Sequence, residues 1–79
     1  MINFVVQMPT LDVPLPSEKQ IRRALNIAND VEITTYEASD SFHHFILRIH
    51  VPFSDKKATF FQEKLMRSKL PFTQVWRKR

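Results

Sequence analysis

The sequence predicts a small α+β domain, and its hydrophobic pattern provides three indications of this. Four segments alternate apolar and polar residues with the period of two that β-strands require. Two further segments repeat apolar residues three and four positions apart, which is the spacing of an amphipathic helix. The order strand, helix, strand, strand, helix, strand allows two crossovers, and these would form one antiparallel sheet with both helices on one face.

The first predicted elements are a strand over residues 2–8 and a helix that begins at Ser17. Three prolines between residues 9 and 16 exclude a helix there and favour an extended loop. Gln20 completes a capping-box pattern three residues after Ser17. Asn29 is expected to end the helix, because Asn tolerates the left-handed conformation. The apolar stripe of this helix would be Ile21, Ala24, Leu25 and Ala28.

The middle of the chain predicts two strands, over residues 31–37 and 42–51, joined by a turn rich in Asp and Ser. Pairing Tyr36 with Phe42 places Ile33 opposite Phe45, so that the apolar faces of the two strands coincide.

The last third predicts a second helix and a final strand. Ser54 would cap a helix from Asp55 to about Lys69, with Pro71 as its stop. The buried stripe of this helix would be Ala58, Phe61 and Leu65. Residues 72–79 would form the last strand, which leaves open which sheet face Phe72 and Trp76 occupy. The complete order resembles the ferredoxin-like sandwich, as a single domain over residues 1–79.

Composition narrows the function classes. The 79 residues include no Gly and no Cys, which excludes glycine-rich phosphate loops, thiolate metal sites and thiol nucleophiles. His43 and His44 would point to opposite faces of a strand, so they are not expected to share a metal. We therefore expect no catalytic residues, no metal and no cofactor. The N-terminus lacks the pattern of a signal peptide, and no long apolar run is present, which predicts a cytoplasmic protein with no membrane partner.

Charge is unevenly distributed along the chain. Residues 1–51 carry a balance of −2 and residues 52–79 a balance of +6. The second helix would present Lys56, Phe60, Lys64 and Arg67 to solvent, and the chain ends in Arg77, Lys78 and Arg79. Such an asymmetry favours an anionic partner at the C-terminal half.

The sheet face away from the helices is the other candidate surface. It would combine rings that can stack on bases with cations that can contact phosphates, as single-stranded nucleic-acid sites do. Its predicted members are Tyr36, Phe42, His44, Ile46 and Arg48, joined by Trp76 if the last strand turns that residue to the same face. RNA-recognition motifs share the predicted topology, but here the first strand has no outward aromatic residue, and the third strand has Phe42 to Ile46 in place of a glycine-interleaved aromatic segment.

Two hypotheses follow. The first is a small non-enzymatic module that binds a nucleic acid or a nucleoprotein complex through the basic C-terminal half and the aromatic, basic sheet face. The second is a protein-only regulator or inhibitor, of the adaptor type that mobile elements encode, which would use the apolar part of the same face to contact a larger protein or to form a homodimer.

Overall fold

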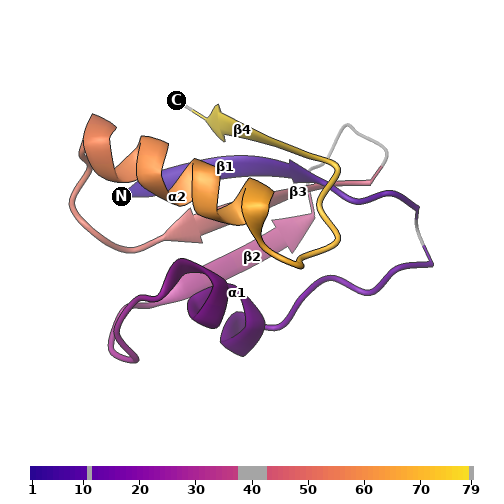
Figure 1. Cartoon of the computed structure of the whole chain (residues 1–79), viewed down its shortest axis with the longest axis horizontal. Coiled ribbons are helices and arrows are strands. Elements are labelled where there is room, and N and C mark those ends of the chain that lie inside the picture. Colours follow the sequence, from indigo (N-terminus) through magenta and orange to yellow (C-terminus); the bar gives the residue numbers. More distant parts are fainter. Residues whose placement is uncertain (11, 38–42, 79) are drawn as a thin grey trace.

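The protein forms a four-stranded antiparallel sheet packed against two helices, an α+β architecture (Figure 1). The structure is a computed structural model and describes residues 1–10, 12–37 and 43–78. Along the chain the elements are β1 (Ile2–Gln7), α1 (Glu18–Leu25), β2 (Ile33–Glu37), β3 (His44–Ile49), α2 (Asp55–Arg67) and β4 (Gln74–Lys78).

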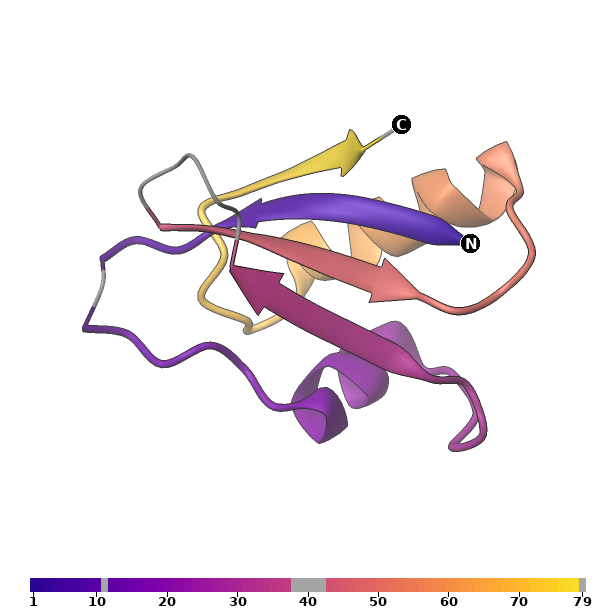
Figure 2. The ribbon, with the colours of Figure 1, turned by 180° about the vertical axis from the view of Figure 1, so that it is seen from behind.

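The strand order in the sheet is β2-β3-β1-β4, and every neighbouring pair is antiparallel. Both helices lie in front of the sheet in Figure 1, and the view from behind in Figure 2 has the sheet in front of them. One sheet face is therefore covered by helices, and neither of the two helices in the described residues covers the other face. Of the two helices, α1 contacts β2 and α2 contacts β4.

The core lies between the sheet and the helices. Alternate residues of the central strands point into it and are almost fully buried, including Phe4 and Leu47 at 0% exposure. Helix α1 contributes Ile21 and Leu25 to the core. Helix α2 contributes Ala58, Phe61 and Leu65, which confirms the predicted buried stripe of this helix. Partly buried apolar residues, Phe72 among them, pack around this cluster.

The predicted start of α1 is confirmed, but the predicted end is wrong. Ser17 Oγ accepts the N–H of Gln20, and Gln20 Oε1 accepts the N–H of Ser17, which is the complete capping box. The helix ends at Leu25 because Asn26, not Asn29, takes the left-handed conformation, with φ 55° and ψ 48°. Its N–H donates to the carbonyls of the last turn. Ala28, predicted in the helix stripe, therefore lies in the following turn and is exposed.

The predicted pairing of β2 with β3 is also wrong. Ile33 pairs with Ile49 and Thr35 with Leu47, so Ile33 does not face Phe45 as the shorter turn required. The difference is an even number of residues, and for that reason the apolar faces still coincide. Phe42, the predicted partner of Tyr36, lies outside the described residues; Tyr36 pairs with Ile46.

Most of the predicted helices and strands extend further than the observed ones. The second helix ends at Arg67, with Ser68 as its C-cap, and Ser54 accepts the N–H of Lys57 at the predicted N-cap. The last strand starts at Gln74, and β2 starts two residues later than predicted, at Ile33. Val31 instead accepts a hydrogen bond from the Arg22 guanidinium, which ties α1 to the approach to β2.

Candidate functional site

The face that no helix covers, named here the open face, is formed by alternate residues of all four strands. Strand pairing aligns one row across it, in the order Tyr36, Ile46, Val5 and Trp76. A parallel row one step away contains Thr34, Arg48, Asn3 and Lys78. The first row is apolar with an aromatic ring at each edge of the sheet, and the second row is polar and basic.

Tyr36 and Trp76 are the exposed rings of the apolar row, each 41% exposed. They are three strand spacings apart, about 14 Å at the usual interstrand distance. Ile46, which we expected to be an exposed member of an apolar patch, is only 4% exposed. Its place in the middle of a central strand, between Tyr36 and Val5, explains this burial. It therefore offers little surface to a partner.

Arg48 is held in place on this face by its neighbours. Its Nε donates to Asn3 Oδ1 at 3.0 Å, and its terminal nitrogen donates to the Tyr36 hydroxyl at 3.3 Å. The guanidinium also lies 5.7 Å from the centroid of the Tyr36 ring. None of these contacts neutralises it, because Asn3 and Tyr36 are uncharged side chains. Arg48 thus presents an oriented positive charge beside an exposed ring.

Trp76, on the edge strand β4, contacts an aromatic ring on β3. The ring of His44 meets it edge to face, with the centroids 5.3 Å apart. This contact crosses β1 diagonally, because Trp76 pairs with Val5 and His44 pairs with the next outward residue, Gln7. Edge-to-face packing of this kind restrains the indole. It also settles the side of the sheet that Trp76 occupies.

A polar cluster closes one corner of the open face. Thr34 Oγ1 and His50 Nε2 share a hydrogen bond of 2.9 Å, and His50 Nδ1 lies 4.0 Å from the Glu32 carboxylate. On the described strand residues of this face, Arg48 and Lys78 carry fixed positive charges and no acidic residue accompanies them. Glu32 lies just outside β2, at the edge. The described strand residues of the open face therefore carry a net positive charge.

The candidates on α2 lie on the opposite side of the molecule. Phe60 is 51% exposed, and the Lys64 ammonium lies 5.3 Å from its ring centroid. Together with Arg67 they line a shallow hollow of about 500 Å³ between the two helices. Lys56 is exposed one turn before Phe60 and does not line it.

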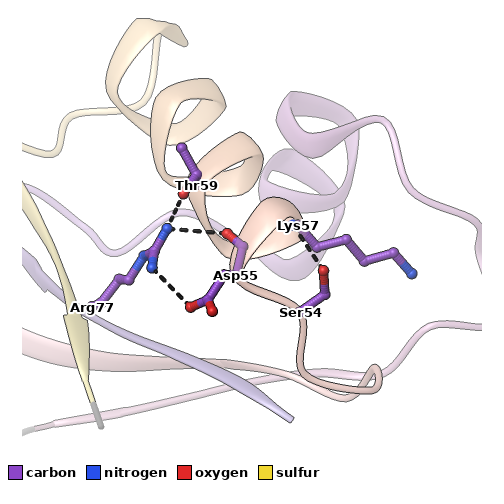
Figure 3. A network of polar contacts seen from close by, with 5 residues as sticks. All are labelled: Ser54, Asp55, Lys57, Thr59 and Arg77. Atoms are coloured by element: carbon purple, nitrogen blue, oxygen red, sulfur yellow. Dashed lines mark hydrogen bonds and ion pairs between the residues drawn. The ribbon is translucent and has the colours of Figure 1, made fainter.

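Arg77 belongs to the helix side as well, although its neighbours Trp76 and Lys78 lie on the open face. Its guanidinium donates to the Asp55 carboxylate at 3.4 Å, to the Asp55 carbonyl at 3.1 Å and to the Thr59 hydroxyl (Figure 3). These contacts join β4 to the first turn of α2. Arg77 is thus a structural cation, and the predicted basic tail does not act as one surface.

The predicted site residues therefore divide into two groups on opposite faces. Phe42 and Arg79 lie outside the described residues. The predicted site residues did not include Asn3, Arg23 or Lys69, although the outward position of Asn3 on the first strand was visible. Arg23 was recognisable as a solvent-facing cation of the first helix, but its nearness to α2 depends on the packing of the two helices.

Two further observations bear on the predicted function classes. Over residues 1–10, 12–37 and 43–78, no three His, Asp or Glu side chains gather in a way that could hold a metal ion. Neither described helix has the length and apolar character needed to cross a membrane. Comparison with protein-family models, with curated proteins and with solved structures found no significant match to the chain.

Proposed function

We propose that this chain is a small non-catalytic module that binds single-stranded nucleic acid on its open face. The observation that carries the proposal is the pair of aligned rows: exposed Tyr36 and Trp76 at the two ends of one, with Arg48 and Lys78 in the next. Single-strand binding needs ring faces for the bases and cations for the backbone, and the two rows supply them side by side.

The spacing of the rings sets the length of strand that fits. A nucleic-acid strand with the duplex spacing of about 3.4 Å per nucleotide covers the roughly 14 Å between Tyr36 and Trp76 in about four nucleotides, and a stretched strand needs fewer. Bases at the two ends of that segment would stack on the rings. The backbone between them would pass Arg48, whose hydrogen bonds to Asn3 and Tyr36 already orient it.

We also propose that the architecture is the ferredoxin-like sandwich. The element order β-α-β-β-α-β and the central position of β1 and β3 support it. In this arrangement the helices leave one sheet face free for a ligand. A cytoplasmic location, expected from the sequence, fits a nucleic-acid partner.

The protein-only alternative would need a sizeable apolar patch on the same face. The burial of Ile46 removes its expected centre and leaves Val5, Tyr36 and Trp76 among polar neighbours. This composition favours nucleic acid over a homodimer, since dimer interfaces are more apolar than the remaining surface.

The intrinsic fluorescence of Trp76 tests the proposal directly, because it is the only tryptophan in the chain. Titration with an oligothymidylate of about 10 nucleotides should quench it, with weaker quenching at high salt. With a labelled oligonucleotide, Tyr36→Ala and Trp76→Ala should each weaken binding by about 5- to 150-fold, the equivalent of 1–3 kcal/mol per stacked base.

Phe60→Ala is the matched control, because Phe60 is an aromatic residue that is 51% exposed and lies on the helix side, opposite the open face. It should leave the affinity unchanged. An unquenched Trp76 together with binding no tighter than millimolar at low salt would refute the proposal. Light scattering after size exclusion would then show whether the open face is occupied in a homodimer.

A further inference from the structure

The helix side carries a continuous basic surface that the proposed function does not use. Three hollows lie around α1 and share lining residues: the first and second share Ala24 and Ser68, and the second and third share Arg23. We name this surface the basic track. Its cations are Lys19, Arg22, Arg23, Lys64, Arg67 and Lys69, and among the residues that the structure describes the only acidic side chain that lines it is Glu63.

Most of these cations are available to a ligand. Arg22 is held by Glu18 at 3.7 Å and by the Val31 carbonyl. Within the described part of the chain, the other five form no ion pair and no side-chain hydrogen bond; Lys64 lies over the Phe60 ring. Unpaired cations grouped in this way raise the local positive potential and attract a polyanion.

The composition of the track distinguishes between two kinds of polyanion. The centres of protein interfaces are depleted in Lys and enriched in apolar anchors. Here three of the six cations are Lys, and of the described residues that line the hollows Phe60 is the only large apolar one that is exposed. This composition suits a phosphate backbone better than an acidic protein surface.

A duplex fits this surface better than a single strand. Apart from Phe60, whose ring is already next to the Lys64 ammonium, the track offers no ring on which an unpaired base could stack. Binding would depend on charge alone, and a duplex presents about one phosphate charge per 1.7 Å of its axis.

We propose that the basic track binds the phosphate backbone of a nucleic-acid duplex, without regard to sequence. The duplex site stands independently of the open face. We further propose that the protein bridges a duplex and a single strand, and this second step rests on the proposed function.

The dimensions of the molecule permit both ligands at once. The two surfaces lie on opposite sides of a domain whose shortest extent is 20 Å. This distance exceeds the screening length of about 8 Å at physiological salt, so repulsion between the two bound backbones is largely screened.

The test of the duplex site measures anisotropy of a labelled duplex of about 20 base pairs at about 50 and 200 mM salt. The double variant Lys64→Gln/Arg67→Gln should lower the affinity at least tenfold, and it should reduce the salt slope by about two, one for each lost phosphate contact. The matched control is Lys56→Gln/Lys57→Gln, which removes the same charge from the same helix outside the hollows; it should change the affinity by less than about threefold. Equal losses in the two variants would overturn the proposal, and so would a wild-type affinity no tighter than millimolar at low salt.

Bridging is tested by energy transfer between a donor-labelled duplex and an acceptor-labelled oligothymidylate. Transfer that occurs only when the protein is present and is lost in Trp76→Ala supports two sites on one molecule. Displacement of the duplex by the single strand would overturn the bridge. Binding of the duplex without any binding of the single strand would refute the open-face function and the bridge, while the duplex site would stand.

Discussion

The two sides of this molecule carry positive charge in different ways. On the open face, Arg48 is fixed by hydrogen bonds to Asn3 and Tyr36, beside rings held by strand pairing. On the helix side, Lys64, Arg67 and Lys69 are exposed ends of flexible side chains. A fixed cation loses little conformational entropy when it binds and favours one geometry, whereas flexible cations tolerate many. Under the two proposals, the fixed charge of the open face suits a ligand of defined geometry, and the flexible charges of the helix side suit a polyanion of variable shape.

The largest expected effect comes from the core that both faces share. Phe4 is fully buried between the sheet and the helices, and Phe4→Ala should cost about 3–5 kcal/mol of unfolding free energy. That is a large part of the roughly 4–12 kcal/mol expected for a chain of this size. Chemical denaturation measures the loss, and single-strand and duplex binding should fall together. Phe53→Ala, the exposed counterpart, should change stability by less than about 0.5 kcal/mol. Equal losses for the two phenylalanines would contradict the described core.

A second prediction separates the helix side from the sheet. Asn26 is left-handed at the end of α1, so Asn26→Ala should destabilise the protein by about 1–2 kcal/mol, whereas Asn26→Gly should be neutral or stabilising. Asn29→Ala, at the exposed residue that the sequence suggested as the cap, should lie within about 0.5 kcal/mol of wild type. Denaturation curves for the three variants decide between the two caps. A larger loss at residue 29 than at residue 26 would place the end of α1 where the sequence predicted it.

The two asparagines illustrate how far the sequence could predict this fold. Hydrophobic periodicity identified all six elements and the buried stripe of α2, because burial of one face imposes that period on any sequence that folds in this way. It could not choose between Asn26 and Asn29, since both are compatible with a left-handed cap and tertiary packing decides. The register of β2 against β3 failed for a related reason. Shifting a pairing by an even number of residues keeps the apolar faces together, so the pattern alone does not fix the turn length.

The sequence could predict which residues lie on the candidate face, but not how exposed they are or which of them contact one another. Alternation correctly assigned Tyr36, His44 and Arg48 to the side away from the helices. The prediction that Ile46 is exposed was wrong. Alternation indicates the sheet face on which a side chain lies, but it does not show how far side chains of the neighbouring strands cover it. The partnership of Arg48 with Asn3 joins residues 45 positions apart, and it becomes visible only once β1 is paired with β3.

A third prediction tests fixed against flexible cations. Arg48→Lys keeps the charge but loses the planar group that donates to Asn3 and Tyr36, so single-strand affinity should fall about three- to tenfold. Arg67→Lys makes the same exchange on the basic track and should alter duplex affinity by less than about twofold, because a phosphate backbone needs only the charge there. Anisotropy titrations of both variants measure the contrast. Equal sensitivity would mean that the helix side also recognises shape.

The smallest expected effect comes from Lys78 and Arg77, two adjacent residues of β4 whose side chains lie on opposite faces. Lys78 lies on the open face, so Lys78→Gln should weaken single-strand binding about two- to threefold and reduce its salt slope by about 0.7, the value of one phosphate on a single strand. Arg77 points to the other side, where Asp55 and Thr59 hold it. Arg77→Gln should therefore leave the slope unchanged and cost less than about 1 kcal/mol of stability, as expected for an exposed ion pair. Both variants remove one charge from the same strand, so net charge cannot explain a difference between them. If the two slopes fell equally, binding would depend on the overall charge of β4, and the assignment of the single strand to the open face would be wrong.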